Sequence, residues 1–245
     1  MSNPLKRRIV VLTGAGVSAE SGLGTFRDED GIWTKYPLED LATPEGFARN
    51  PVFVHGFYND RRRQLATAKP NPAHFALAGI EQAVAEAGGR FTLVTQNVDN
   101  LHEQAGSRTV LHMHGELTSV FCTECSQKFA WRTDLGLETA CRSCGSQGYM
   151  RPDIVWFGEM PYFMDEIEAA LGDCDLFVSI GTSGTVYPAA GFVQIARYHG
   201  ADTLELNLAP SDGASLFRQS RYGPASEIVP AWAGELTGHK AGSLP

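Results

Sequence analysis

Four cysteines in this chain have the spacing of a site for one metal ion. Cys122 and Cys125 form one Cys-x-x-Cys pair, and Cys141 and Cys144 form a second pair after fifteen intervening residues. Two residues between thiols let one tight turn direct both sulfurs at the same ion, and two such turns complete a tetrahedral Zn²⁺ site. The alternatives are disulfides, a redox pair or unpaired core thiols. The spacing favours a structural zinc, because four thiolates leave no position open for a catalytic water.

A glycine-rich segment has the pattern of a phosphate-binding turn. Residues 14–19, Gly-Ala-Gly-Val-Ser-Ala, fit G-x-G-x-x-[G/A] directly after the β-branched run 8–13. In that motif Gly14 allows the turn, Gly16 lets the backbone approach a pyrophosphate, and Ala19 permits close packing of a helix whose N-terminus faces the phosphates. The alternative is an ordinary glycine-rich turn.

The composition excludes several classes of protein. The chain has 245 residues, of which 43% are hydrophobic and 20% charged, with a net charge of −8 and a pI of about 5.4. An acidic chain is a poor candidate for binding nucleic acid, and the basic run 61–63 is by default an exposed helix face. No apolar run is long enough to span a membrane, and residues 1–8 do not resemble a signal peptide.

We therefore expect a cytoplasmic protein with neither nucleic acid nor a membrane as a partner. Reduced thiols in that compartment favour metal binding over disulfides. The fifth cysteine, Cys174, stands between apolar residues and is expected to be a small buried residue rather than a ligand.

The elements that must position these residues alternate along the chain. Apolar runs predict strands, and periodic segments, two of which begin at proline, predict helices. The predicted fold class is α/β, with a Rossmann-like parallel sheet covered by helices on both faces and a small zinc-binding domain. Glycine or polar residues follow the strands at the edge where such sheets bind ligands, namely Gly14, Gln96, Gly181 and Asn207. The predicted strands are 8–13, 91–95, 176–181 and 203–208, and the predicted helices are 51–69, 72–87, 164–171 and 189–199.

One region departs from an ordinary dinucleotide site. An acidic residue at the end of the second strand normally holds the ribose, but residues 24–37 read GTFRDEDGIWTKYP, which is a polar loop. A polar loop beside a phosphate site favours a closing cover, and the alternative is a surface insertion. The arrangement disfavours a standard dehydrogenase.

Taken together, the motifs resemble those of sirtuins, the NAD-dependent protein lysine deacylases. GAGVSAESGLGTFR, TQNVDNLH, HMHGEL, the two cysteine pairs, VWFGE, GTS, LNLAP and YGPAS occur in sirtuin order over about residues 8–235, and YNDR at 58–61 resembles class III, which includes bacterial deacylases. The resemblance implies that NAD is consumed as a co-substrate, giving nicotinamide and O-acyl-ADP-ribose.

The same resemblance implies one sirtuin domain, 1–245, in two parts. The Rossmann-like part comprises approximately 1–35, 88–116 and 151–245, and the smaller part comprises a helical insertion, 36–87, and a zinc ribbon, 117–150. NAD and acyl-lysine would bind in the cleft between the two parts.

The resemblance assigns the catalytic residues. His114 corresponds to the general base that takes a proton from a ribose hydroxyl, a task suited to an imidazole. Asn97 and Asp99 correspond to the pair that lines the nicotinamide and ribose pocket, although an N-x-D sequence is also typical of a helix cap. The neighbouring His112 is expected to be a hydrogen-bonded core residue.

The remaining contacts to NAD also follow from the resemblance. Phe26 and Arg27 correspond to the cover loop, where Gly24 replaces a proline common in the family and loosens the backbone. The full set of expected NAD contacts is Gly14, Ala15, Gly16, Ser18, Ala19, Glu20, Thr25, Phe26, Arg27, Trp33, Gln96, Asn97, Asp99, His114, Gly181, Thr182, Ser183, Asn207, Leu208, Ala209 and Ala225.

Two further segments correspond to the substrate site. The segment Val155, Trp156, Phe157, Gly158 and Glu159 matches the one that pairs with the peptide backbone. Tyr58 and Arg61 are three residues apart on a predicted helix and could bind an acyl carboxylate together, while Ala42 leaves room for a longer acyl chain. The alternative is a solvated Tyr–Arg pair.

The expected function is removal of succinyl, malonyl and acetyl groups from lysine in proteins by a monomeric enzyme. The alternatives are protein ADP-ribosyl transfer, a catalytically silent NAD-binding module and an ordinary dehydrogenase. The pair Tyr58 and Arg61 argues for deacylation, and the joint presence of His114, Asn97 and Asp99 argues against a silent module.

Overall fold

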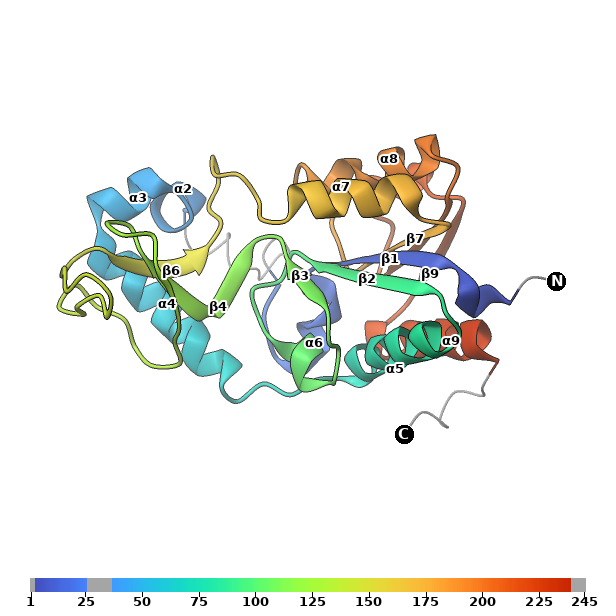
Figure 1. The fold of residues 1–245 in the computed structure, drawn as a ribbon, viewed down its shortest axis with the longest axis horizontal. Helices are drawn as coiled ribbons and strands as arrows, with labels where there is room; N and C mark the ends of the chain where they lie inside the picture. The colour runs from blue at the N-terminus through green and yellow to red at the C-terminus, as the bar shows by residue number, and fades with distance from the viewer. Residues whose placement is uncertain (1–2, 26–36, 239–245) are drawn as a thin grey trace.

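The computed structural model describes residues 3–25 and 37–238, and its largest element is a six-stranded parallel sheet (Figure 1). The strand order is β3-β2-β1-β7-β8-β9, and every neighbouring pair is parallel. Runs of apolar residues suit strands covered on both faces. The strands are β1 (Arg8–Thr13), β2 (Arg90–Thr95), β3 (Val110–His112), β7 (Leu176–Ile180), β8 (Asp202–Asn207) and β9 (Gln219–Tyr222).

Helices cover both faces of this sheet, so the predicted architecture is confirmed. Successive side chains of a strand point to opposite faces. Accordingly Ile9 joins a core with α5 and α9, whereas Val10 joins a separate core with α7 and α8 (Figure 1). The helices on these faces are α5 (Pro72–Glu86), α6 (Leu101–Gln104), α7 (Met164–Asp173), α8 (Phe192–Tyr198) and α9 (Ala225–Thr237).

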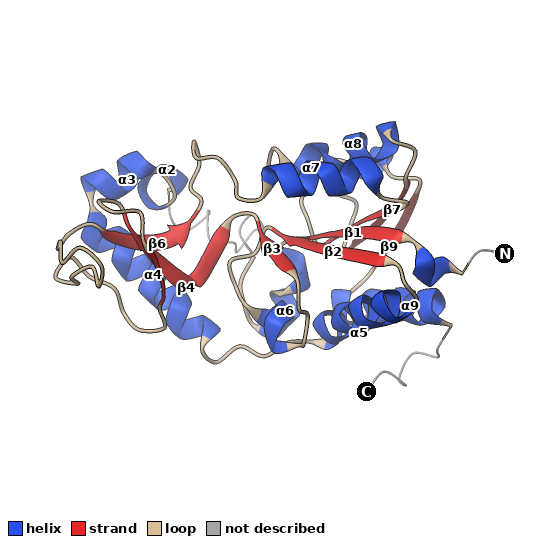
Figure 2. Cartoon of the chain, in the orientation of Figure 1, coloured by secondary structure: helices blue, strands red, loops and turns tan. Residues whose placement is uncertain are grey.

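A second, smaller group of elements lies at the other end of the molecule (Figure 2). Its antiparallel sheet has the order β5-β4-β6, and α4 packs against β4 and β6, with α2 and α3 packed on α4. These elements are α2 (Leu38–Leu41), α3 (Pro44–Arg49), α4 (Pro51–Leu65), β4 (Gly115–Cys122), β5 (Lys128–Ala130) and β6 (Met150–Ile154). Within the described residues, no helix is both long and apolar enough to cross a membrane.

Caps and prolines explain where α4 and α5 begin. The side chain of Asn50 accepts a hydrogen bond from the N–H of Phe53, and proline follows at the first helical position. Asn71 caps α5 in the same way. The prediction extended α4 to residue 69, but the helix ends at Leu65. Pro70 disfavours a helical conformation at the residue before it.

The observed packing differs from the expected ranges of the two parts. Helix α5, which was grouped with the small part, packs against α9 and β2. Its apolar stripe, including Leu77 and Ile80, is fully buried in the core of the large sheet. Strand β6, grouped with the large part, pairs instead with β4. In this packing α5 belongs with the large sheet and β6 with the small one, and the division into domains remains a prediction.

The glycine-rich segment after β1 does not begin an α-helix. Two short 3₁₀ turns, Ala15–Val17 and Ala19–Ser21, follow the strand, and Gly22 ends the second in a left-handed conformation. The expectation that phosphates face the N-terminus of a helix here was therefore wrong. These turns form because the segment folds back against the loop after β7, where the N–H of Gly16 donates to the carbonyl oxygen of Gly181 over 2.9 Å.

Close approach of these two loops accounts for their glycines. A Cβ atom on Gly14 would lie 2.7 Å from the carbonyl oxygen of Gly181, and one on Gly16 would lie 2.8 Å from its Cα. Gly181 has a φ of +63°, and a Cβ there would lie 2.5 Å from the backbone nitrogen of Val17. The contact between the two loops thus requires glycine whatever ligand binds beside them.

Replacing Gly181 with alanine is expected to destabilise the fold by about 2–4 kcal/mol, because it combines a strained φ with a backbone clash. Urea denaturation would measure the loss. Gly56→Ala is the control, since a Cβ on this residue of α4 meets nothing within 4 Å. That change should stabilise the protein by about 0.5–1 kcal/mol. Equal midpoints for Gly181→Ala and the wild type would contradict the prediction.

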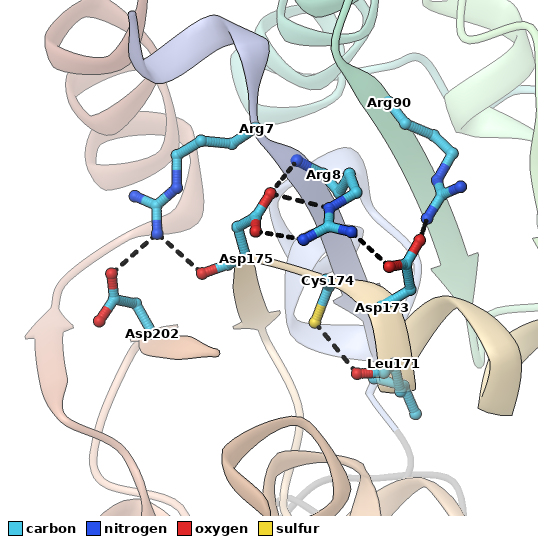
Figure 3. A network of polar contacts seen from close by, with 8 residues as sticks. All are labelled: Arg7, Arg8, Arg90, Leu171, Asp173, Cys174, Asp175 and Asp202. Carbon is cyan, nitrogen blue, oxygen red and sulfur yellow. Dashed lines mark hydrogen bonds and ion pairs between the residues drawn. The ribbon is translucent and has the colours of Figure 1, made fainter. Parts of the chain in front are cut away.

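Ion pairs join the amino ends of several strands of the large sheet (Figure 3). The guanidinium of Arg8 donates to both carboxylate oxygens of Asp175, over 3.0 and 2.6 Å. Arg8 also pairs with Asp173, which pairs in turn with Arg90 at the start of β2. Hydrogen bonding to Arg8 lowers the pKa of Asp175 to about 2. These groups are largely exposed, so each pair is worth little by itself, but together they link β1, β2 and the start of β7.

Candidate active site

A cavity of about 890 Å³ lies at the carboxyl ends of the large sheet. The loops after β1, β2, β3, β7 and β8 all contribute to it, which is the edge that the sequence predicted. The segments of residues 42, 57–61 and 154–161 complete its wall. The expected site residues that line it are Gly14, Ala15, Gly16, Ala19, Glu20, Thr25, Ala42, Tyr58, Arg61, Gln96, Asn97, His114, Val155, Trp156, Phe157, Gly158, Glu159, Gly181, Thr182, Ser183, Asn207, Leu208, Ala209 and Ala225.

Two of the expected residues that the structure describes are not part of this lining. Ser18 and Asp99 are buried behind it. Phe26, Arg27 and Trp33 lie outside the described residues.

Sequence reasoning missed about a third of the cavity-lining residues that the structure describes. Most of these are apolar or small and adjoin a recognised motif, as Val98 adjoins Asn97 and Pro224 adjoins Ala225. Their position next to these motifs could have indicated that they line the site, whereas an apolar side chain by itself does not indicate a site. The missed residues are Phe57, Val98, Ile154, Pro161, Val186, Tyr187, Pro188, Leu206, Pro210, Ser211, Asp212, Gly223 and Pro224.

A hydrogen-bond chain fixes the amide of Asn97. Its Nδ2 donates to the carbonyl oxygen of Gly14 over 3.1 Å and to Oγ of Ser18 over 3.2 Å. Ser18 Oγ donates to Asp99 over 3.0 Å, and Asp99 also accepts the N–H of Leu101 over 3.1 Å. Asp99, which precedes the N-cap residue Asn100, therefore accepts the first N–H of α6 and also holds Ser18. Because both amide hydrogens of Asn97 are used, its Oδ1 is the group that can accept a hydrogen bond from a ligand.

Two buried histidines lie next to these hydrogen-bonded residues. Nδ1 of His74 accepts the N–H of Asn71, so its Nε2 carries the proton and donates to Ser18 Oγ over 3.4 Å. Nε2 of His102 lies 3.0 Å from Thr13 Oγ1. Burial lowers the pKa of His74 to about 4 and places that of His102 well below its usual value. Both rings are therefore neutral at pH 7 and have a structural role.

His114 is arranged to accept a proton. Its Nδ1 lies 3.2 Å from the carbonyl oxygen of Gln96, which can only accept, so Nδ1 carries the hydrogen in the neutral ring. Nε2 then has a free lone pair, and the ring forms part of the cavity wall. Burial lowers the pKa of His114, with the Gln96 contact opposing it, so the unprotonated form dominates at neutral pH.

The neighbouring His112 is a hydrogen-bonded core residue, as expected. It is 5% exposed, and its Nε2 lies 2.7 Å from a carboxylate oxygen of Glu103. Burial lowers its pKa, but hydrogen bonding and charge from Glu103 outweigh this, and the net shift is upward. The end of β3 and the turn after it thus place two histidines in different environments, and of the two only His114 lines the cavity.

Tyr58 and Arg61 lie together at one end of the cavity. They are one helical turn apart on α4, which directs both side chains to the same side, and Ala42 lines the same cavity. Burial raises the pKa of Tyr58 to about 12, so its phenol is neutral. Burial lowers the pKa of Arg61, but a guanidinium remains charged at neutral pH. A neutral donor and a cation in a largely desolvated wall suit a carboxylate.

The backbone of the 155–159 segment is partly used within the protein. The N–H of Val155 donates to the carbonyl oxygen of His114, and that of Phe157 donates to Ala42, both over 2.9 Å. Within the described part of the chain, the carbonyl oxygens of Val155 and Phe157 accept no hydrogen bond. These oxygens are therefore the groups through which an extended peptide could pair.

The four cysteines converge as predicted. Their sulfurs all lie within 4.8 Å of one another, with 3.8 Å between Cys122 and Cys144 and 3.6 Å between Cys125 and Cys141. A tetrahedral ion with Zn–S bonds of about 2.3 Å places its sulfurs about 3.8 Å apart. No disulfide joins them, and the donor set suits one structural zinc. Cys174 is 5% exposed and belongs to the buried core that Val10 joins. Burial raises the pKa of its thiol to about 11.

Comparison with known proteins identifies the family. The model of the Sir2 family matches residues 14–188, which is most of the chain and includes the glycine-rich turn, His114 and all four cysteines. The chain belongs to the Sir2 family. Its sequence features thus occur together because they are parts of one sirtuin architecture.

Individual sirtuins resemble this chain along most of their length. An NAD-dependent protein deacylase of Caulobacter vibrioides is 58% identical, over 94% of this chain and 96% of its own. A protein of the same name from Salmonella typhimurium is 56% identical, over 94% and 83%. A solved structure of a Sir2 homologue in complex with NAD superposes with a TM-score of 0.86 at 37% identity, covering 96% of this chain and 92% of the other.

The sirtuin cavity of this chain fits a dinucleotide. Gly14 and Gly16 line it without side chains, so backbone can approach a pyrophosphate there. Asn207, at the end of β8, donates from Nδ2 to the carbonyl oxygen of Thr182 over 2.8 Å, which orders the loop after β7 beside it. These loops offer the polar groups that a ribose and phosphates require.

Proposed function

We propose that this sirtuin removes acidic acyl groups, succinyl and malonyl, from protein lysines in addition to acetyl groups, and that it consumes NAD in doing so. The deacylase names of its relatives support the NAD-dependent reaction. The observation that carries the acyl preference is the convergence of Tyr58 and Arg61 in the same cavity as His114. One water molecule is consumed as the lysine amine leaves the acyl carbon, and the products are the free lysine, nicotinamide and O-acyl-ADP-ribose.

His114 acts as the general base in this proposal. NAD supplies the ribose carbon that receives the acyl oxygen when nicotinamide leaves. Nε2 of His114 takes the proton of a ribose hydroxyl, which lets the oxygen attack the acyl carbon. Asn97, held by Gly14 and Ser18, positions the nicotinamide and ribose end through its Oδ1. Asp99 acts through Ser18 and is a positioning residue rather than a contact.

The acyl preference has a simple electrostatic cause. Succinyl and malonyl groups end in a carboxylate, which Arg61 can bind with two parallel hydrogen bonds and Tyr58 with one. An acetyl group lacks that carboxylate and gains nothing from the guanidinium. Ala42, small and buried, leaves the space that the longer chain requires.

Replacing Arg61 with methionine tests this proposal. We expect kcat/KM for a succinyl-lysine peptide to fall about 100-fold, because a desolvated charged hydrogen bond is lost. The value for the matched acetyl-lysine peptide should stay within about threefold, since its binding uses no carboxylate contact. Nicotinamide release and peptide mass are the measurements.

Arg63→Met is the matched control, because Arg63 is exposed and pairs with Asp60 and Asp134 outside the cavity. It should leave both activities unchanged. Equal loss of both activities in Arg61→Met would contradict the acidic preference. Nicotinamide release without loss of acyl groups would favour ADP-ribosyl transfer instead.

We further propose that the protein is cytoplasmic and monomeric, with acylated proteins as its partners and no nucleic acid or membrane partner. The four-thiolate site supports a reducing compartment, where thiols remain available to the metal. The net charge of −8 argues against nucleic acid. Light scattering of the zinc-loaded protein would test the monomer.

A further inference from the structure

The side chain of Trp156 contacts the acyl pocket directly. It is 2% exposed and lines the cavity, and its Nε1 donates a hydrogen bond to the phenolic oxygen of Tyr58 over 2.8 Å. The two rings lie 6.3 Å apart between centroids. Trp156 belongs to the segment expected to pair with the peptide backbone, yet this contact involves its indole, which points to the acyl end of the site.

This hydrogen bond determines the direction in which Tyr58 can donate. An indole N–H is only a donor, so the Tyr58 oxygen accepts on that side and its own hydrogen must point elsewhere. Among residues 3–25 and 37–238, no acceptor takes that hydrogen. The raised pKa of Tyr58 keeps the phenol protonated at neutral pH. Tyr58 therefore presents a preset donor, with Arg61 one turn away.

The indole itself is held rigidly. The guanidinium of Arg151 lies 3.4 Å from the centroid of the Trp156 ring system, and Arg151 binds both oxygens of Glu159 over 2.8 and 3.0 Å. Glu159 also accepts the backbone N–H of Trp156 over 2.8 Å. The ring of Phe47 packs against the indole at 5.3 Å. With Arg151 and Trp156 both buried, the indole has no room to turn away from Tyr58.

We propose that Trp156 is a positioning residue that determines acyl specificity. Its indole orients the hydroxyl of Tyr58 as a donor to the carboxylate of an acidic acyl group. This inference rests on the proposed function. The Tyr58 oxygen accepts from the indole and donates to the acyl carboxylate, so the two bonds polarise each other. A hydroxyl fixed before binding loses less rotational freedom when the acyl group arrives.

The sharpest test replaces the indole N–H and nothing else. Substituting Trp156 by 3-benzothienylalanine puts sulfur in place of the N–H in a ring of similar shape. Succinyl-lysine and butyryl-lysine peptides are compared, because they differ by a carboxylate against a methyl group at equal chain length. The kcat/KM ratio of succinyl to butyryl should fall about fivefold, mostly through the KM for succinyl, as loss of one hydrogen bond predicts. The butyryl value should fall less than the succinyl value, because butyryl has no carboxylate to accept the Tyr58 hydrogen.

The control is the same substitution at Trp131, whose Nε1 donates to the carbonyl oxygen of Asp134 in the zinc-binding region, away from the cavity. It should leave the ratio unchanged. Trp156→Phe also lacks the N–H and must lower the ratio, so the result does not depend on one variant folding well.

The outcomes separate this inference from the proposed function. A wild-type preference for succinyl that both Trp156 variants retain overturns the role of the indole alone. Equal loss for both peptides assigns Trp156 a purely structural role and also overturns it. Wild-type protein that releases no nicotinamide with either peptide overturns the proposed function, and the inference with it.

Discussion

Replacing His114 with alanine is expected to lower kcat for deacylation by about 10²–10⁴-fold, the usual contribution of a general base. The structure gives the reason, because the Gln96 carbonyl holds the proton on Nδ1 and leaves Nε2 to accept one at the cavity wall. Nicotinamide and free lysine would be measured under saturating NAD and peptide. His199→Ala is the control, since this histidine is exposed on the far end of α8.

The pH dependence gives this prediction a second, independent readout. The base must be unprotonated, and burial places the pKa of His114 below its ordinary value. Activity should therefore be retained from neutral pH into mildly acidic conditions, and fall only below the lowered pKa as the ring gains a proton. His114→Ala should lack that acidic limb. A variant that keeps both its rate and the limb would show that another group serves as the base.

Replacing Cys141 with serine is expected to abolish zinc binding and unfold the region around the site. A structural zinc contributes on the order of 10 kcal/mol to folding of small zinc modules, more than the little apolar core here can offset. That core contains Val120, Leu135 and Met150 beside the ligands themselves. Metal analysis should give one zinc per wild-type chain and none for the variant, and amide exchange should rise over residues 119–150.

Cys174→Ala separates loss of zinc from general damage. This thiol is buried in the core between the large sheet and α7, so its removal costs some packing but leaves all four ligands in place. It should retain one zinc per chain and normal exchange over residues 119–150. Full zinc content in Cys141→Ser would contradict the proposed ligand set.

The sequence could predict those features that depend on local pattern. The buried strand β1 can be recognised from a short run of apolar residues, because it is covered on both faces. The zinc site can be recognised from the spacing of its paired cysteines, because tetrahedral ligation requires that spacing. Proline at the first helical position likewise marked the starts of α4 and α5. The ligand edge followed from these, since parallel strands place their carboxyl ends together.

Other features depend on contacts between distant segments, which no local pattern encodes. The 3₁₀ turns after β1 exist because Gly16 meets Gly181, far along the chain. Helix α5 joins the large sheet because its apolar stripe fits against α9. The bond from Trp156 to Tyr58 joins residues 98 positions apart, and only their packing brings them together.

The ion pairs of Figure 3 lie at the opposite ends of the strands from the cavity. Engineers often find that a more durable enzyme is a slower one, because the stabilising changes stiffen the groups that must move. Here Arg8 and Asp173 link the amino ends of the strands, and stabilising substitutions at these ends would lie far from the active-site cavity. Substitutions around them could extend shelf life while turnover stays the same.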